Sequence, residues 1–336
     1  MLNRKKTALT RTSVLRVLLL VTVLFVGRTA SAWSECGHHI ISLLAFDLLS
    51  TADQERLLSL LATHPRYQED FEPPESIRGV QQITRWRVGR AGYWPDVARQ
   101  QPEYDRPKWH YQLAATLTMG NRAACEIPTT PGPCPPTATL ETQELHIAQA
   151  IALCRRVMCN RDAPAADRAI ALTWLAHLVG DAHQPCHAGS LYAERALPQG
   201  DRGANSIPIH PDRNMHWVWD DLLGRRFNQD AVHQCVTEVT RQEELQRIGL
   251  RAARHPRGLD PLIWLQESRE SAVRYVYTAD VLRAVTLVSR KLTNEVQPIG
   301  LSTNYMKRAK EVARERAAQA SYRLAAIWRE GLGERR

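Results

Sequence analysis

The sequence of 336 residues has no Asn-x-Ser/Thr acceptor for N-linked glycosylation and no Cys-x-x-Cys-His motif. The first absence is consistent with a protein exported by a bacterium, and the second disfavours covalently attached haem. Strand-like alternation of polar and apolar residues is scarce, and we find no repeat or low-complexity tract. What remains is typical of a globular protein, because 44% hydrophobic residues are enough for a sizeable core.

Acidic residues are absent from residues 1–32, which have the three parts of a secretory signal sequence. A basic start at residues 4–6 is followed by a mostly apolar run over 14–26 and a small-residue cleavage site at 30–32. An uncleaved membrane anchor is the alternative, but the apolar run is shorter than the ~20 residues that a span needs. We therefore predict cleavage between Ala32 and Trp33, a mature domain over residues 33–336, and a secreted or periplasmic location.

Removal of the signal sequence lowers the formal charge from +9 to +3, because it carries six Lys or Arg residues and no Asp or Glu. The mature protein is then only mildly basic. This composition disfavours a broad cationic face for duplex phosphates, although it allows a local groove.

Seven cysteines follow the predicted cleavage site, and export would permit disulfides. Cys125 and Cys134 flank a Pro-rich loop, and Cys154 and Cys159 lie five apart across an expected helix end. We consider both pairs plausible bridges. The odd number leaves at least one free thiol, and the sequence alone does not fix the connectivity.

Apolar residues recur at spacings of three and four from Gly37 onwards, which predicts an all-α fold of amphipathic helices in one compact multi-helix domain. Two further helices are expected over 140–157 and 165–179, the second apolar enough all round to be buried. Residues 268–332 predict more long helices. The Pro- and Gly-rich ranges 120–139 and 199–213 predict loops.

The stretch from His177 to His187 carries the clearest chemistry. His177 and Asp181 are four residues apart, so they project from one face of the buried helix. An imidazole and a carboxylate that converge in a dry site suit zinc, and the break at Pro185 can bring His187 to a neighbouring position. A buried hydrogen-bonded pair is the alternative interpretation.

A second pair, His216 and Asp220, repeats the spacing of four in aromatic surroundings. Asp96 follows Trp-Pro, and His110 lies between aromatic residues. Taken alone, Asp96 would be read as a helix cap and His110 as a core residue. The predicted new terminus adds Trp33, whose α-amino group, with a pKa near ~7.7, could bind a metal together with its carbonyl oxygen.

These motifs, in this order, resemble the zinc-dependent single-strand nuclease and 3′-nucleotidase family of fungi, plants and bacteria. The resemblance is carried by Trp33 with His38, by Trp-x-Asp96, by Trp-His110-Tyr111, by the 177–187 stretch and by Asn-x-His-x-Val-Trp-Asp over 214–220. It extends over residues 33–330. It implies a compact helical domain with three zinc ions in a cleft, single-stranded DNA or RNA and nucleotides as substrates, and a monomer without a stable protein partner.

The resemblance also implies the ligands of each zinc. Asp96, His110, His177 and Asp181 would hold the first ion, His187, His216 and Asp220 the second, and the Trp33 amine and carbonyl, His38 and again Asp181 the third. Water between the first and third ions would attack phosphorus, and the second ion would take up the charge on the leaving 3′ oxygen, which releases 5′-phosphorylated products. Asp181 would thus take part in catalysis through both ions.

Two further residues match positions that contact the substrate in this family. The Arg99 guanidinium would stabilise charge on the phosphate in the transition state, and the Tyr111 ring would stack on a splayed base, which an intact duplex cannot offer. Three departures from the family pattern are Ser34 and Ala204 in place of Gly and Leu113 in place of Asp. At the first two positions the backbone conformation can differ from that of the family, and the third leaves the base preference open.

Two other functions compete with the nuclease. A zinc phospholipase C shares the fold, but that group typically ends the second motif with Glu four residues after His, where this chain has Asp220. A non-catalytic periplasmic zinc-binding protein would keep every ligand and have no use for Arg99 or Tyr111. His183 is expected to orient its neighbours rather than to bind metal.

Overall fold

The computed structural model describes residues 33–333. The predicted signal sequence, residues 1–32, lies outside the described residues, so its cleavage stays a prediction. Among the described helices none combines the length and the apolar character that crossing a bilayer requires.

Helices dominate the described chain, and the all-α prediction is confirmed. The helices are α1 (Glu35–Asp47), α2 (Thr51–Leu61), α3 (Tyr67–Asp70), α4 (Val80–Val97), α5 (Ile147–Cys159), α6 (Ala165–Ala182), α7 (Met215–Asp220), α8 (Gln229–Arg241), α9 (Glu243–Arg254), α10 (Pro261–Ser271), α11 (Ala279–Ser289) and α12 (Thr303–Leu332). Short 3-10 turns include Pro107–His110 and Pro185–His187, and a π-helical turn, Ala272–Val276, follows α10.

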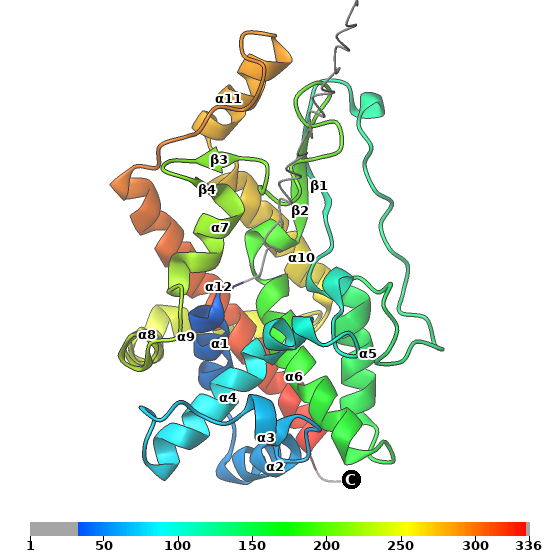
Figure 1. The fold of residues 1–336 in the computed structure, drawn as a ribbon, viewed down its shortest axis with the longest axis vertical. Helices are drawn as coiled ribbons and strands as arrows, with labels where there is room; N and C mark the ends of the chain where they lie inside the picture. Colours follow the sequence, from blue (N-terminus) through cyan, green and yellow to red (C-terminus); the bar gives the residue numbers. More distant parts are fainter. Residues whose placement is uncertain (1–32, 334–336) are drawn as a thin grey trace, which may run out of the picture.

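The core is built around α6, which packs against α1, α4, α5 and α12 (Figure 1). Every residue from Ala171 to Ala182 is buried, as the predicted all-round apolar character requires. The helix continues three residues beyond the expected end at Val179. A helix with no solvent face can present polar side chains only to other protein groups or to a bound ligand.

Residues 33–333 include two small pairs of strands that the sequence pattern did not indicate. β1 (Ala114–Met119) pairs in parallel with β2 (Gly189–Ala193), and β3 (Pro208–Ile209) pairs antiparallel with β4 (Arg213–Asn214). β1 directly follows the segment of His110, and β2 directly follows that of His187. This pairing therefore brings two candidate ligands together from positions far apart in the sequence.

One predicted helix boundary is wrong, because the helix expected from Leu140 begins at Ile147. At its start the side chain of Gln149 accepts a hydrogen bond from the His146 N–H at 3.0 Å, which ends the preceding turns and caps the helix. Leu145 is buried although it precedes the helix. The loop before Ile147 is apolar because it packs on the core, and its apolar residues produce the same sequence pattern as a helix.

Neither predicted disulfide is formed, and all seven cysteines carry free thiols. For Cys154 and Cys159 the reason is helical geometry. Both lie on α5, where a separation of five residues places side chains about 140° apart around the axis. Cys154 accordingly points into the core, whereas Cys159 is exposed.

Candidate metal centre

The buried helix α6 supplies the central pair, His177 and Asp181. Both are completely buried, and His177 Nε2 lies 3.1 Å from Asp181 Oδ2 across one helical turn. The other ring nitrogen of His177, Nδ1, lies 2.8 Å from the Gly92 carbonyl oxygen. With Nδ1 as the donor to this carbonyl, Nε2 keeps its lone pair on the side of Asp181, where a metal ion could bind both, and this tautomer is usual for a histidine that binds metal.

Three other segments converge on this pair. His38 of α1 stacks on His177 with ring centroids 4.0 Å apart, and its Nε2 lies 3.4 Å from Asp181 Oδ1. His110, at the end of the Pro107–His110 turn, places Nδ1 3.1 Å from Asp181 Oδ2 and 2.9 Å from His177 Nε2. Asp96 comes from the last turn of α4.

A second cluster lies at the start of α7. His216 Nε2 lies 3.0 Å from His187 Nε2 and 3.7 Å from Asp220 Oδ2. His216 Nδ1 donates to the Gly203 carbonyl oxygen at 2.6 Å, and His187 Nδ1 donates to the His110 carbonyl oxygen at 2.7 Å. Both rings are thus fixed with Nε2 toward the shared space, and the His110 backbone connects the two clusters.

These side chains form three groups whose ligand atoms lie within 4.8 Å of one another. The groups are His38, His177 and Asp181; Asp96, His110 and His177; and His187, His216 and Asp220. The group of His187, His216 and Asp220, called the second metal group below, is the set expected for the second zinc. The group of Asp96, His110 and His177 is the set expected for the first zinc without Asp181. In the group of His38 and Asp181, His177 takes part where the expected set has the terminal amine of Trp33.

The Trp33 side chain is completely buried, and its Nε1–H donates to the Gly180 carbonyl oxygen at 3.0 Å. The next residue, Ser34, donates its N–H to the Asp220 carbonyl oxygen at 3.1 Å. These two bonds hold residue 33 between α6 and α7. The structure therefore places the Trp33 side chain against Gly180, which precedes Asp181 in α6, although the free amine depends on a cleavage outside the described residues.

Burial makes the imidazoles of the site neutral. It lowers the pKa of His38 to about 3 and the pKa of His110, His177 and His216 to about 4. Burial would raise the pKa of Asp96, but the nearby His177 ring and the Arg99 guanidinium hold it well below the usual range. At neutral pH the site therefore offers unprotonated nitrogen and the Asp96 carboxylate. Burial raises the pKa of Asp181 and that of Asp220 instead, so the positive charge of a metal ion would favour the ionised form of both.

Several buried polar atoms at this site have no hydrogen-bond partner. They are Asp181 Oδ1, His110 Nε2 and both ring nitrogens of His38. An unpaired buried polar group costs about 1–3 kcal/mol, so such a concentration is unusual in a core. A metal ion between Asp181 Oδ1 and His38 Nε2, which lie 3.4 Å apart, would satisfy both of these atoms, and this nitrogen and oxygen donor set suits zinc.

Arg99 and Tyr111 lie next to the candidate ligands. Arg99 Nε donates to Asp96 Oδ1 at 2.7 Å, while its Nη2 is buried without a partner. The guanidinium thus keeps a donor for a phosphate oxygen. Tyr111 follows His110 in extended conformation and is partly buried.

Gln184 supports the second cluster, where sequence reasoning gave it no role. Its Nε2 donates to Asp220 Oδ1 at 2.6 Å, which fixes the carboxylate that faces His216. Its place inside the 177–187 stretch is the signal that could have identified it.

A buried ionic cluster supports the end of α6. His183, expected to orient its neighbours, donates from Nδ1 to the Val179 carbonyl oxygen at 2.7 Å and accepts at Nε2 from Arg323 at 2.8 Å. Arg323 and Arg316 of α12 also bind Glu267 of α10. The sequence pattern did not predict a role for these three charged residues. Two arginines seven apart among alanines of an amphipathic helix were the available signal.

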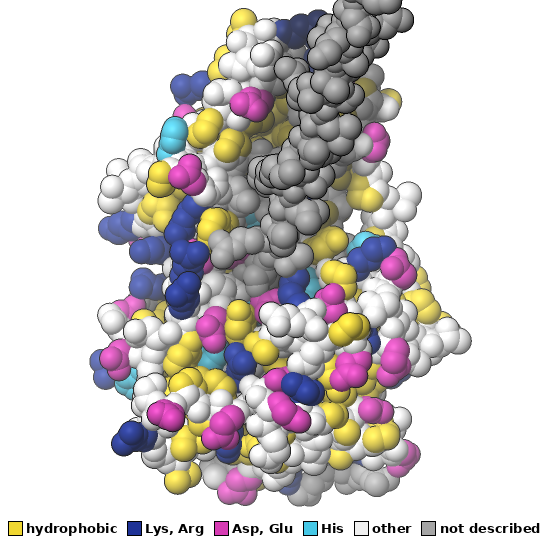
Figure 2. Space-filling model, in the orientation of Figure 1, with side chains coloured by type: hydrophobic (Ala, Val, Ile, Leu, Met, Phe, Trp, Pro, Cys, Tyr) yellow, Lys and Arg dark blue, Asp and Glu magenta, His cyan; other side chains and the backbone are white. Residues whose placement is uncertain are grey.

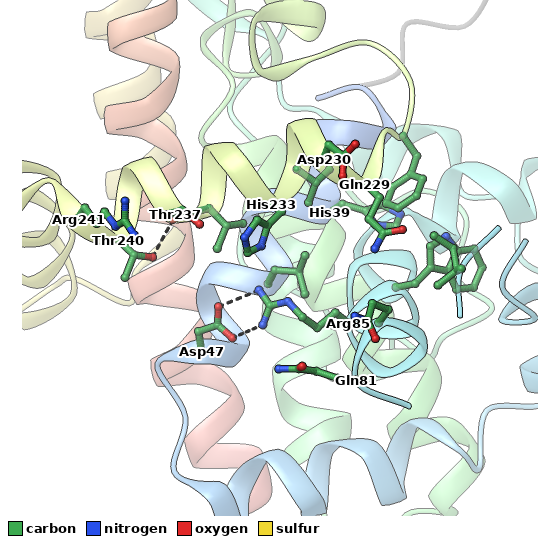
Figure 3. A pocket seen from close by; sticks show the side chains of 17 residues that line it. His39, Asp47, Gln81, Arg85, Gln229, Asp230, His233, Thr237, Thr240 and Arg241 are labelled. Carbon is green, nitrogen blue, oxygen red and sulfur yellow. Dashed lines mark hydrogen bonds and ion pairs between the residues drawn. The ribbon is translucent and has the colours of Figure 1, made fainter. Parts of the chain in front are cut away.

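A cavity of about 530 Å³ lies on the other side of α1, where it is lined by residues of α1, α4 and α8 (Figure 3). His39 forms part of its wall, and Asp47 and Arg85 join across it through hydrogen bonds of 2.7 and 3.0 Å. None of the candidate metal ligands lines it. His38 and His39 therefore face different sides of α1, and His38 alone of the two belongs to a candidate metal group.

Comparisons with known proteins agree with this geometry. The model of the S1/P1 Nuclease family matches residues 33–332. Endonuclease 3, Endonuclease 4 and Endonuclease 5 of Arabidopsis thaliana are each 41% identical to this chain over 56 residues. That stretch is 16% of this chain and 16% of each relative, so the curated relatives match over only a small part of their length.

Proposed function

This chain belongs to the S1/P1 nuclease family, and we propose that it is a secreted phosphodiesterase with three zinc ions. Its substrates would be single-stranded DNA or RNA, cut to 5′-phosphorylated products, with 3′-nucleotidase activity in addition. The observation that carries this proposal is the set of three His and Asp groups, with neutral imidazoles and unpartnered buried atoms, inside the matched region.

The ligands of each ion follow from the groups and the family. Asp96, His110, His177 and Asp181 would hold the first zinc; His187, His216 and Asp220 the second; and His38, Asp181 and the terminal amine and carbonyl of Trp33 the third. When bound, zinc supplies Lewis-acid stabilisation of phosphoryl oxygens and a water that loses its proton near neutral pH.

The protein contributes binding, orientation and charge. The free Nη2 of Arg99 donates to a non-bridging phosphate oxygen, and Asp96 holds the guanidinium in place for this contact. The Tyr111 ring stacks on an unpaired base, a contact worth about 1–3 kcal/mol. A paired base offers no free face, so this contact favours single strands. The hydrogen bonds of His187, His216 and Gln184 keep the second group aligned.

The test is hydrolysis of single-stranded DNA, RNA, duplex DNA and a short-chain phosphatidylcholine by a chain that begins at Trp33. Two variants are compared with it, His177→Ala and a chain with one extra residue before Trp33. We expect zinc-dependent cutting of the single strands that both variants lose. Phosphatidylcholine turnover alone, or stoichiometric zinc without turnover, would overturn the proposal in favour of a phospholipase C or a zinc-binding protein.

A further inference from the structure

A cluster of two arginines and a tryptophan on the surface adjoins the second metal group, which is His187, His216 and Asp220. The Arg213 guanidinium carbon lies 5.0 Å from the centre of the Trp217 ring, and that of Arg225 lies 5.0 Å from the same ring. Asp221 Oδ2 lies 3.1 Å from Arg213 Nη1 and 3.8 Å from Arg225 Nε. One carboxylate and one ring thus orient two guanidinium groups, and the cluster keeps a net positive charge.

The cluster is tied rigidly to the metal group through α7. Trp217 directly follows His216, and side chains one residue apart point about 100° apart around a helix. The buried His216 therefore faces the metal group while the half-buried Trp217 faces the surface. Asn214 caps the helix by accepting from the Trp217 N–H at 2.7 Å, and Trp219 Nε1 donates to the Tyr305 hydroxyl at 3.0 Å.

The guanidinium groups remain accessible. The side chains of Arg213 and Arg225 are 37% and 45% exposed. Each guanidinium has five N–H donors, and Asp221 occupies only part of this capacity. Figure 2 shows Lys and Arg side chains gathered in a run over α7 and the segment that leads to α8. Exposed ion pairs contribute only about 0–1 kcal/mol to stability, so a purely structural role explains little of this arrangement.

We propose that Arg213, Trp217 and Arg225 form a phosphate-binding subsite for the nucleic-acid strand beside the scissile phosphodiester. The subsite rests on the proposed nuclease function. The two guanidinium groups donate to backbone phosphate oxygens, and the Trp217 ring holds both groups at a fixed spacing. Contacts to the backbone carry no sequence information, so the subsite strengthens binding of long strands irrespective of base.

The test compares the mature zinc-loaded wild type with Arg213→Gln/Arg225→Gln on a single-stranded oligonucleotide of about 20 nucleotides and on a dinucleotide, which lacks flanking phosphates. We expect KM for the oligonucleotide to rise about tenfold with kcat unchanged, and the dinucleotide KM to change less than about twofold. The slope of log(kcat/KM) against the logarithm of the salt concentration should become shallower by about 1.4 for the oligonucleotide. Each phosphate of a single strand that the protein neutralises contributes about 0.7 to this slope.

A matched control removes two arginines from exposed ion pairs elsewhere, Arg155→Gln/Arg257→Gln, and should leave both substrates and the salt slope unchanged. Trp217→Phe should retain most of the binding and Trp217→Ala should lose it, because a ring supports the guanidinium groups. Equal losses on both substrates, or no change in the salt slope, would overturn the subsite.

Binding in the presence of EDTA separates the subsite from the proposed function. Fluorescence anisotropy of a labelled oligonucleotide should show weaker binding to the double arginine variant than to the wild type. If the wild type binds the oligonucleotide in this way but cuts no nucleic acid with zinc, the proposed function fails and the subsite stands. If the two proteins bind equally, the subsite fails whatever the wild type cuts.

Discussion

Glu267→Gln removes one negative charge from the buried ionic cluster that supports the end of α6. Glu267 Oε2 accepts from Arg316 Nη1 at 3.1 Å and from Arg323 Nη1 at 2.6 Å, and Oε1 accepts from Arg323 Nη2 at 2.8 Å. Burial would raise the pKa of Glu267, but the bonds and charges of the two arginines hold it below its usual value. The carboxylate is therefore ionised at neutral pH. An amide cannot neutralise the arginines, and its NH2 group would face one of their donors.

The expected cost is large because the arginines cannot reach water. Arg323 is 0% and Arg316 3% exposed. Removal of one partner from a buried ion pair costs about 3–5 kcal/mol, and because the Glu267 side chain is itself 30% exposed we expect the lower end, about 3 kcal/mol. For a chain of this length each kcal/mol lowers Tm by ~2 °C, so we expect a drop of roughly 6 °C. Because Arg323 also holds His183 after α6, zinc affinity should fall as well.

Thermal unfolding followed by circular dichroism measures the first effect, and competition with a chromogenic chelator measures the second. Glu330→Gln is the matched control, because Glu330 accepts two 2.7 Å bonds from Arg155 on the surface. Such an exposed pair contributes about 0–1 kcal/mol, so this variant should melt within ~2 °C of the wild type. Similar melting temperatures for the two variants would refute the argument from burial.

Three further predictions concern the metal groups and acid stability. Asp181→Asn should lower the zinc content per chain as measured by mass spectrometry of the metal, because this carboxylate contacts His38, His110 and His177. Gln184→Ala should lower the affinity for the second zinc by about 10- to 100-fold in the chelator assay, because Asp220 loses the hydrogen bond from the Gln184 amide. Burial lowers the pKa of His64 from 6.5 to about 4, so below pH 6.5 the unfolded state binds a proton that the folded state does not. His64 alone should therefore lower stability by about 3 kcal/mol from pH 6.5 to pH 4, and urea titrations of His64→Leu should show a fall smaller by about this amount.

Local spacing explains why much of the site could be predicted from the sequence. His177 and Asp181 share a helical face through a spacing of four, and His216 and Asp220 do so on α7. A spacing of this kind acts within one helix, so it does not depend on the rest of the fold. The apolar run of α6 likewise indicated burial directly.

Long-range packing explains what could not be predicted. Arg316 and Arg323 bind Glu267 from about fifty residues away, and neither α12 nor α10 alone indicates that they meet. The early start of the helix expected at Leu140 has a similar origin, because the loop before Ile147 is apolar for contact with the core. A repeat of apolar residues indicates burial, and because packed loops are buried as well as helices, it does not by itself locate the start of a helix.

Ala204 and Ser34, which replace glycines of the family pattern, both lie close to the second metal group. Ala204 adopts φ 65°, a left-handed conformation that costs a residue with a Cβ about 1–2 kcal/mol. The neighbouring Gly203 has no such latitude, because a Cβ there would lie 2.1 Å from the Cys186 carbonyl oxygen. Since Gly203 supplies the carbonyl that holds His216, the glycine that this contact requires is present. The Ser34 N–H donates to the Asp220 carbonyl at the end of α7, and the Ser34 hydroxyl donates to the Gly224 carbonyl just after it. The serine side chain thus adds a bond that glycine could not make to the segment that follows α7.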